Sequence, residues 1–143
     1  MNSGPEPSAF SALLSRYFDE VGISARVLSK LEVVELDERI RKSGDVRGGS
    51  LGFSTKVRSI HLDANNLDEV RDFLAMKLRR YEGTSLLVLE DTNNHGFELS
   101  FHGLIQSVVE ILRSATGHIY ILDDKFRLVA IVKIPLWTSV RVD

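Results

Sequence analysis

The C-terminal third of the chain sets the strongest constraint on the fold, because two β-rich runs stand there on either side of a short polar turn. Residues 118–122 and 126–134 are rich in isoleucine, leucine and valine, and only Asp123, Asp124 and Lys125 separate them. β-Branched and aromatic residues favour strands, and a turn this short joins antiparallel neighbours. The pattern predicts a β-hairpin.

Three amphipathic patterns predict helices upstream of this hairpin. Residues 103–115 place apolar side chains on one wide stripe, and residues 10–21 show the same three- and four-residue spacing. The third helix is expected to begin after Asn65 or Asn66 and to end before Gly83, because acidic residues follow the asparagines and basic residues stand near its end. The helix dipole favours this distribution of charge.

The remaining strands are predicted from shorter signals. Residues 53–62 alternate in hydropathy, and residues 86–90 and 97–101 flank the turn-forming sequence Asp-Thr-Asn-Asn-His-Gly, which suggests a second hairpin. The apolar spacing in residues 24–42 fits either a helix or a strand, and we expect a strand over 26–36. Residues 45–52 contain three glycines and are expected to form a loop.

This order of elements predicts a single α+β domain over residues 1–143. We expect a mixed or mostly antiparallel sheet with helices packed on one side and a C-terminal β-hairpin, and residues 1–7 are expected to form a frayed leader. The chain has the size of one ordinary domain, and its 43% hydrophobic and 27% charged residues are typical of globular proteins.

Composition excludes several classes of function. The chain has no cysteine, which excludes disulfides, thiolate metal sites and thiol nucleophiles and favours a reducing compartment. With 18 basic and 20 acidic residues, the net charge of −2 argues against a nucleic-acid-binding protein. No run reaches the roughly 18 apolar residues of a membrane span. We therefore expect a soluble, cytoplasmic protein that binds neither nucleic acid nor membranes.

No catalytic motif stands out in the sequence. The nucleophile-elbow, P-loop and dinucleotide-binding patterns are absent. His95 and His102 with Glu98 between them do not have the spacing of a known metal site. His61 with Asp63 would suit a general base and its orienting carboxylate, but no nucleophile signature accompanies them. We expect no catalytic residue, no bound metal and no cofactor.

Aromatic and acidic residues gather in the C-terminal third. The aromatic side chains are Phe97, Phe101, Tyr120, Phe126 and Trp137. The hydrophobic core is the expected place for most of them, and the functional alternative is an aromatic and acidic face that recognises a basic protein partner. The residues predicted to bind that partner are Glu90, Asp91, Glu98, Tyr120, Asp123 and Asp124.

Residues 85–132 resemble small bacterial immunity proteins of polymorphic or contact-dependent toxin systems. The resemblance lies in an apolar strand ending in Glu90-Asp91, a short Phe-rich strand, the helix LIQSVVEIL at 104–112 and the sequence YILDDKFRLV at 120–129. The chain departs from the family pattern at Lys133-Ile134-Pro135, where a polar Glu-Asn-His-His segment is common. The resemblance implies an antitoxin-like, non-enzymatic protein that occludes a cognate toxin domain, and it transfers no catalytic residue.

The sequence is also compatible with two other functions. The first is a structural or regulatory module that self-associates through an exposed strand edge as a homodimer. The second is a small hydrolase built from His61, Asp63, His95 and His102.

Overall fold

The computed structural model describes residues 9–43, 53, 56–90, 95–133 and 136–143 of the chain. The predicted leader at 1–7 and the glycine-containing loop at 45–52 lie outside them. Within the described residues, no helix has the length and apolar character that crossing a membrane requires.

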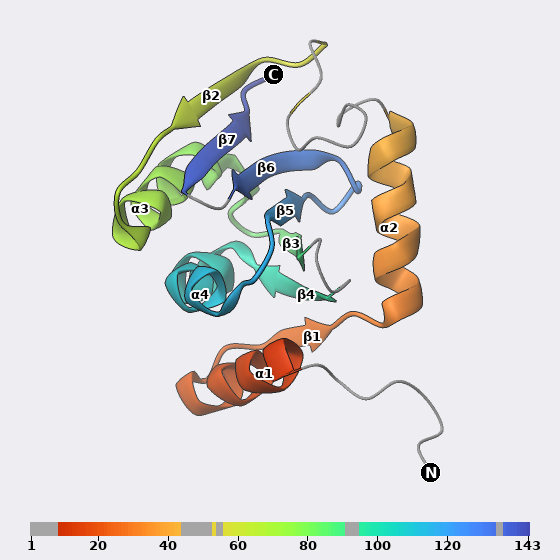
Figure 1. Ribbon diagram of the computed structural model, residues 1–143, viewed down its shortest axis with the longest axis vertical. Helices are drawn as coiled ribbons and strands as arrows, with labels where there is room; N and C mark the ends of the chain where they lie inside the picture. The colour runs from red at the N-terminus through yellow and green to blue at the C-terminus, as the bar shows by residue number, and fades with distance from the viewer. Residues whose placement is uncertain (1–8, 44–52, 54–55, 91–94, 134–135) are drawn as a thin grey trace.

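The described chain folds into four α-helices, one short 3₁₀ helix and a seven-stranded antiparallel sheet (Figure 1). The helices are α1 (Ala9–Val21), α2 (Lys30–Ser43), α3 (Leu67–Lys77), η1 (Arg79–Tyr81) and α4 (Phe101–Ser114). The strands are β1 (Ala25–Val27), β2 (Ser59–Leu62), β3 (Ser85–Glu90), β4 (His95–Ser100), β5 (Ile119–Leu122), β6 (Leu128–Lys133) and β7 (Trp137–Arg141). The strand order is β1-β4-β3-β5-β6-β7-β2, and every neighbouring pair is antiparallel. The predicted α+β class and largely antiparallel sheet are confirmed.

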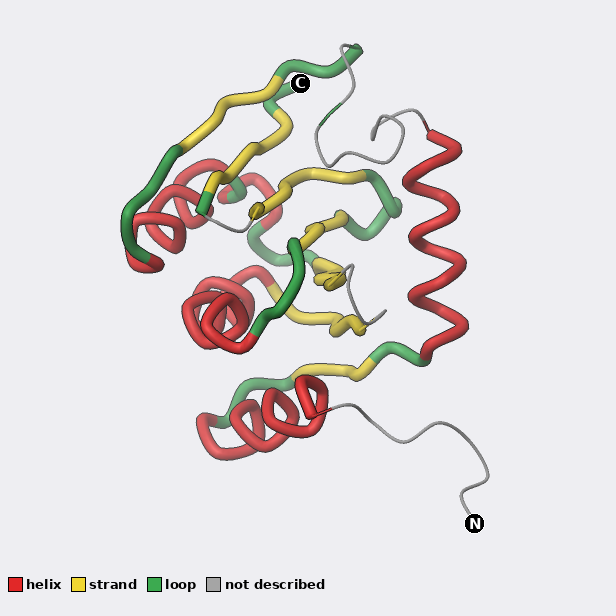
Figure 2. Tube along the Cα trace, viewed as in Figure 1, coloured by secondary structure: helices red, strands yellow, loops and turns green. Residues whose placement is uncertain are grey.

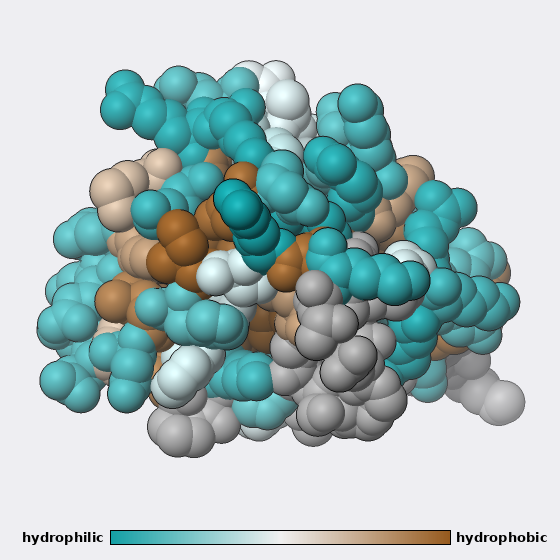
Figure 3. All heavy atoms as spheres, turned by 90° about the horizontal axis from the view of Figure 1, so that it is seen from above, coloured by the Kyte–Doolittle hydropathy of each residue, from teal (hydrophilic) through white to brown (hydrophobic). Residues whose placement is uncertain are grey.

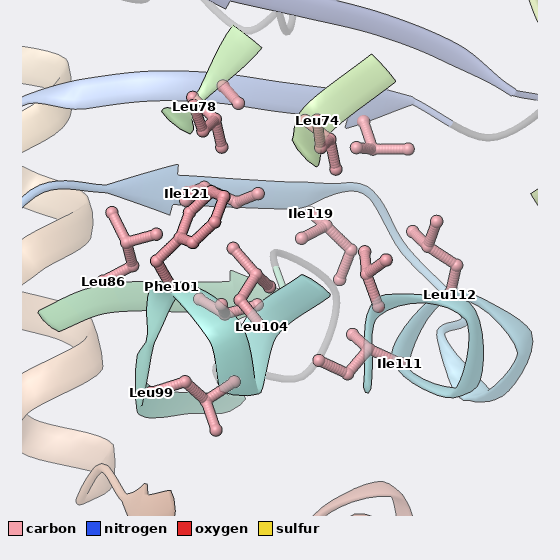
Figure 4. Packing of buried hydrophobic residues seen from close by; sticks show 14 of the residues in the cluster. Leu74, Leu78, Leu86, Leu99, Phe101, Leu104, Ile111, Leu112, Ile119 and Ile121 are labelled. Atoms are coloured by element: carbon pink, nitrogen blue, oxygen red, sulfur yellow. The ribbon is translucent and has the colours of Figure 1, made fainter. Parts of the chain in front are cut away.

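One face of the sheet is covered by α1, α3 and α4 (Figure 2). Side chains alternate between the two faces along each strand, so Ile119 and Ile121 of β5 point to these helices. They pack against Leu104 and Ile111 of α4, with Leu74 of α3 beside them (Figure 4). This cluster is the larger of two hydrophobic cores.

The other face of the sheet is covered by α2, which packs over a second, smaller core. Val33 and Ile40 of α2 contact the strands there, together with the alternate residues Leu87, Tyr120 and Leu122. The expectation of helices on one side therefore holds for three helices, and α2 lies on the opposite side. Strands β3, β5 and β6 are buried on both faces as a result.

The strand predicted over residues 26–36 is wrong beyond its first residues, because β1 ends at Val27 and α2 begins at Lys30. A capping box fixes this boundary. The Glu32 backbone N–H donates to Ser29 Oγ at 3.1 Å, and the Ser29 backbone N–H donates to Glu32 Oε1 at 3.0 Å. These reciprocal bonds satisfy two backbone donors that a helix start leaves without partners, so the segment becomes helical.

Both predicted hairpins are confirmed, as β3–β4 and β5–β6. The predicted strand at 53–62 is shorter in the structure, where β2 comprises Ser59–Leu62. Asn66 is the N-cap of α3, and its side chain accepts the Glu69 backbone N–H at 2.8 Å. The C-terminal segment forms β7 between β6 and β2, which places β2 at one end of the sheet.

Candidate functional site

The six residues predicted to bind a partner do not form one exposed face. Glu90, Tyr120 and Asp123 are buried, with 2%, 2% and 1% of their surface exposed. Glu98 and Asp124 reach the surface, and Asp91 lies outside the described residues. Glu90 and Glu98 also lie on opposite faces of the sheet. Glu90 alternates along β3 with Leu89 of the smaller core, and Glu98 alternates along β4 with Phe97 and Leu99 of the larger core.

Asp123 stabilises the turn between β5 and β6. Its Oδ1 accepts the backbone N–H groups of Lys125 and Arg127, both at 2.9 Å, and its Oδ2 lies 3.0 Å from Arg127 Nε. The side-chain hydrogen bond with Asp123, followed by the charge of that carboxylate, raises the pKa of the Arg127 guanidinium. A carboxylate bonded in this way holds the turn and has little capacity left for a partner.

Glu90 has a structural role where β3 ends, beside the first residue of β5. Its Oε2 accepts the Thr116 backbone N–H at 3.0 Å, which ties β3 to the segment after α4. His95 stands opposite Glu90 in the β3–β4 ladder. Burial lowers the pKa of the His95 imidazole, and the charge of Glu90 opposes that shift.

Among the aromatic residues, Phe97, Phe101 and Tyr120 are core residues, as expected for most of the set. Phe126 and Trp137 are different, because each has 41% of its surface exposed. Phe126 belongs to the β5–β6 turn and Trp137 begins β7. Each of these two side chains belongs to a candidate site.

The first candidate is a groove of about 470 Å³ between α2 and the sheet, which we call the α2 groove. Leu28, Leu36 and Leu87 provide its apolar lining. The charged and aromatic residues that line it are Arg26, Glu32, Glu35, Arg39, Glu98 and Phe126. Of the predicted partner-binding residues, Glu98 lies in this groove and Asp124 lies two positions from Phe126 in the adjoining turn.

An ion-pair network closes one side of the α2 groove. Arg26 Nε lies 2.8 Å from Glu98 Oε1, and its Nη1 lies 3.0 Å from Glu32 Oε2. The hydrogen bonds to Glu98 and Glu32 raise the pKa of Arg26. The backbone hydrogen bond from Ser29, followed by the bond from Arg26, lowers the pKa of Glu32. The network joins β1, β4 and α2. Because its side chains are 36–52% exposed, it adds little to the apolar packing that holds α2 on the sheet.

Phe126 stands at the groove in an unfavourable backbone conformation. Its φ angle is +65°, and it is the one non-glycine residue with positive φ in the described part of the chain. Its backbone N–H donates to the Asp123 carbonyl at 3.0 Å, and the Arg39 guanidinium lies 4.8 Å from the centre of its ring. A bulky residue rarely adopts positive φ, and such strain gathers at functional sites. The strained turn keeps an aromatic ring at the surface beside an arginine.

The second candidate surrounds His61 on the neighbouring strands β2 and β7. Trp137 Nε1 donates to His61 Nδ1 at 2.9 Å, and Ser139 Oγ lies 2.7 Å from the same nitrogen. An indole N–H can only donate, so Trp137 is the donor in its bond with Nδ1. A serine hydrogen-bonded to an imidazole resembles an activated nucleophile. Ser139 is 1% exposed, however, so this geometry gives a substrate no access to its hydroxyl.

The other predicted histidines do not join this cluster. His102 is on α4 and lies 2.7 Å from Glu82 Oε2 through its Nε2, whereas His95 begins β4. Asp63, the expected partner of His61, follows β2, and the contacts of His61 that the structure shows are to Trp137 and Ser139. No group of three or more potential metal ligands occurs among the described residues.

Comparisons with known proteins do not assign the chain to a family. No family model matches the sequence, and neither a curated protein nor a solved structure is significantly similar to it.

Proposed function

We propose that the chain is a non-enzymatic protein-binding module that holds a partner in the α2 groove, as an antitoxin-like immunity protein would hold its toxin. The observation that carries this proposal is Phe126, a strained and half-exposed aromatic residue stacked on Arg39 at the groove. Aromatic and arginine side chains dominate the binding energy of protein interfaces. Backbone strain at such a residue is consistent with selection for binding.

Charge indicates the chemistry of the partner. Three carboxylates, of Glu32, Glu35 and Glu98, line the groove against the guanidinium groups of Arg26 and Arg39. Arg26 already bridges Glu32 and Glu98. Glu35 is exposed, and the described residues show no ion pair for it. A partner that places a basic side chain near Glu35 and an apolar side chain against Phe126 would complement the groove.

The test compares how variants of the tagged protein capture a partner from a lysate of the native host. Glu35→Lys and Phe126→Gly are the groove variants. Glu38→Lys is the matched control for charge, because Glu38 is exposed on α2 outside the groove lining, and Met76→Ala is the control for an exposed apolar residue on α3. Mass spectrometry quantifies the retained proteins.

We expect one stoichiometric partner that the two controls retain and that each groove variant loses by about tenfold or more, which corresponds to about 1.4 kcal/mol. Equal capture by the groove variants and the controls would remove the α2 groove as the binding site. A wild-type protein that retains no partner would contradict the proposed function itself.

A further inference from the structure

Strand β2 leaves backbone hydrogen-bonding groups turned away from the sheet. It is the last strand in the order, and β7 is its one described neighbour (Figures 1 and 2). The Val142 backbone N–H donates to the Arg58 carbonyl at 3.3 Å, which extends the β2–β7 register by one pair. Hydrogen-bonded pairs alternate along an antiparallel ladder, so Ile60 and Leu62 bond to β7. The N–H and C=O groups of Ser59 and His61 point outward.

Within the described residues, the four-residue strand β2 carries only its shortness among the features that normally prevent strand addition. Ser59–Leu62 reads Ser-Ile-His-Leu, without lysine, proline or an acidic residue. Natural proteins protect free edges with charged side chains, proline, bulges or very short strands. The opposite edge differs, because the central residue of β1 is the charged Arg26, which two ion pairs hold in place. The two ends of the sheet therefore differ in their capacity to accept another strand.

A second copy of β2 complements this edge. In an antiparallel pair about a two-fold axis, Ser59 stands opposite His61 of the second copy, and the outward N–H and C=O groups bond to one another. Ile60 then stands opposite Ile60 of the second copy. The Ile60 side chain is 38% exposed, and pairing would cover part of its apolar surface. Arg58 stands opposite Leu62 in this register, so no like charges oppose each other.

We propose that the chain forms a two-fold dimer in which the β2 strands of two copies join their sheets. Strand β2 lies at the top of Figure 1, and Figure 3 shows the molecule from that side. Apolar residues reach the surface there among polar ones. A single short strand pair buries less than the roughly 800 Å² per partner of a standard interface. The dimer is therefore weak and concentration-dependent.

The test is the molar mass in solution, measured by light scattering and sedimentation over a range of protein concentrations. Ser59→Pro removes an outward N–H and leaves the bonds between β2 and β7 in place, and proline is tolerated at the first position of an edge strand. Ala25→Pro is the matched control, since Ala25 begins β1 at the other edge. Its N–H also points outward, because Leu28 N–H donates to the Gly96 carbonyl in the β1–β4 register. Ile60→Lys is a second variant that opposes two like charges at the two-fold axis.

We expect the wild type and Ala25→Pro to approach twice the chain mass of 16.0 kDa as the concentration rises. We expect Ser59→Pro and Ile60→Lys to remain at the mass of one chain, with circular dichroism spectra like that of the wild type. A wild type that stays monomeric up to about 1 mM would overturn the proposal, since a dissociation constant of about 1 mM corresponds to a binding free energy of only about −4 kcal/mol. Dimers of unchanged affinity in both β2 variants would overturn it equally.

Discussion

Phe126 gives the sharpest test of the strained turn beside the α2 groove. We compare Phe126→Ala with Phe126→Gly, since both lose the aromatic ring and its contact with Arg39. They differ only in the Cβ methyl group of alanine, which restricts the backbone. At φ +65° a non-glycine residue bears a cost of about 1–2 kcal/mol. Glycine escapes that cost but loses about 0.4–1 kcal/mol through the greater freedom of its unfolded state. The midpoints of these two ranges differ by about 0.8 kcal/mol, so the glycine variant should be more stable than the alanine variant by about that amount.

The assay is urea unfolding of both variants, followed by circular dichroism, with thermal unfolding as a second measurement. One kcal/mol shifts the melting temperature by roughly 2–4 °C in a domain near this size. Lys125→Ala and Lys125→Gly are the matched pair, because Lys125 is the preceding turn residue and has negative φ. There the order should reverse, with alanine more stable. If alanine is at least as stable as glycine at position 126, the turn is not strained in solution and the argument from Phe126 fails.

Two further predictions concern carboxylates that the structure ties to the backbone. Asp123→Ala should lower the free energy of unfolding by about 2–3 kcal/mol, because the buried Asp123 carboxylate accepts two backbone N–H groups and an arginine N–H. Urea unfolding measures this loss. The control is Asp124→Ala, at an exposed position of the same turn, which should stay within about 0.5 kcal/mol of wild type. The pKa of Glu32 is lowered in the fold, so its ionised form stabilises the protein above its usual pKa of 4.5, and this contribution is lost as the pH falls through the lower folded value. Glu32→Gln should therefore be less stable than wild type at pH 7, and thermal unfolding at pH 3 should show a smaller difference in melting temperature between the two proteins. A difference that does not change with pH would contradict the role of the Glu32 charge.

Sequence reasoning succeeded where the signals are local. The two hairpins and the helices α1, α3 and α4 follow from hydrophobic periodicity and turn residues, which act within a few positions. For α2 the sequence leaves helix and strand open and favours a strand, because the apolar spacing fits both structures. The local signal that resolves the choice is Ser29 followed three residues later by Glu32, a capping-box sequence.

The candidate sites depend on contacts that no local pattern reveals. Arg26 and Glu98 are 72 positions apart, and His61 and Ser139 are 78 positions apart. Composition suggested an acidic face, but burial depends on which strands become central in the sheet. Because β5 is covered on both faces, Tyr120 became a core residue rather than a surface residue.

The α2 groove and the β2 edge lie toward opposite ends of the strand order. The groove is lined from α2, the β5–β6 turn and the strands β1, β4 and β3, which begin that order, whereas β2 ends it. Pairing through β2 would therefore leave the groove of each copy uncovered and place the two grooves far from the two-fold axis. A partner in the groove and a second copy at the edge do not compete for the same surface. Self-association and partner binding are consequently separable by mutation, and a dimer would present two equivalent partner sites.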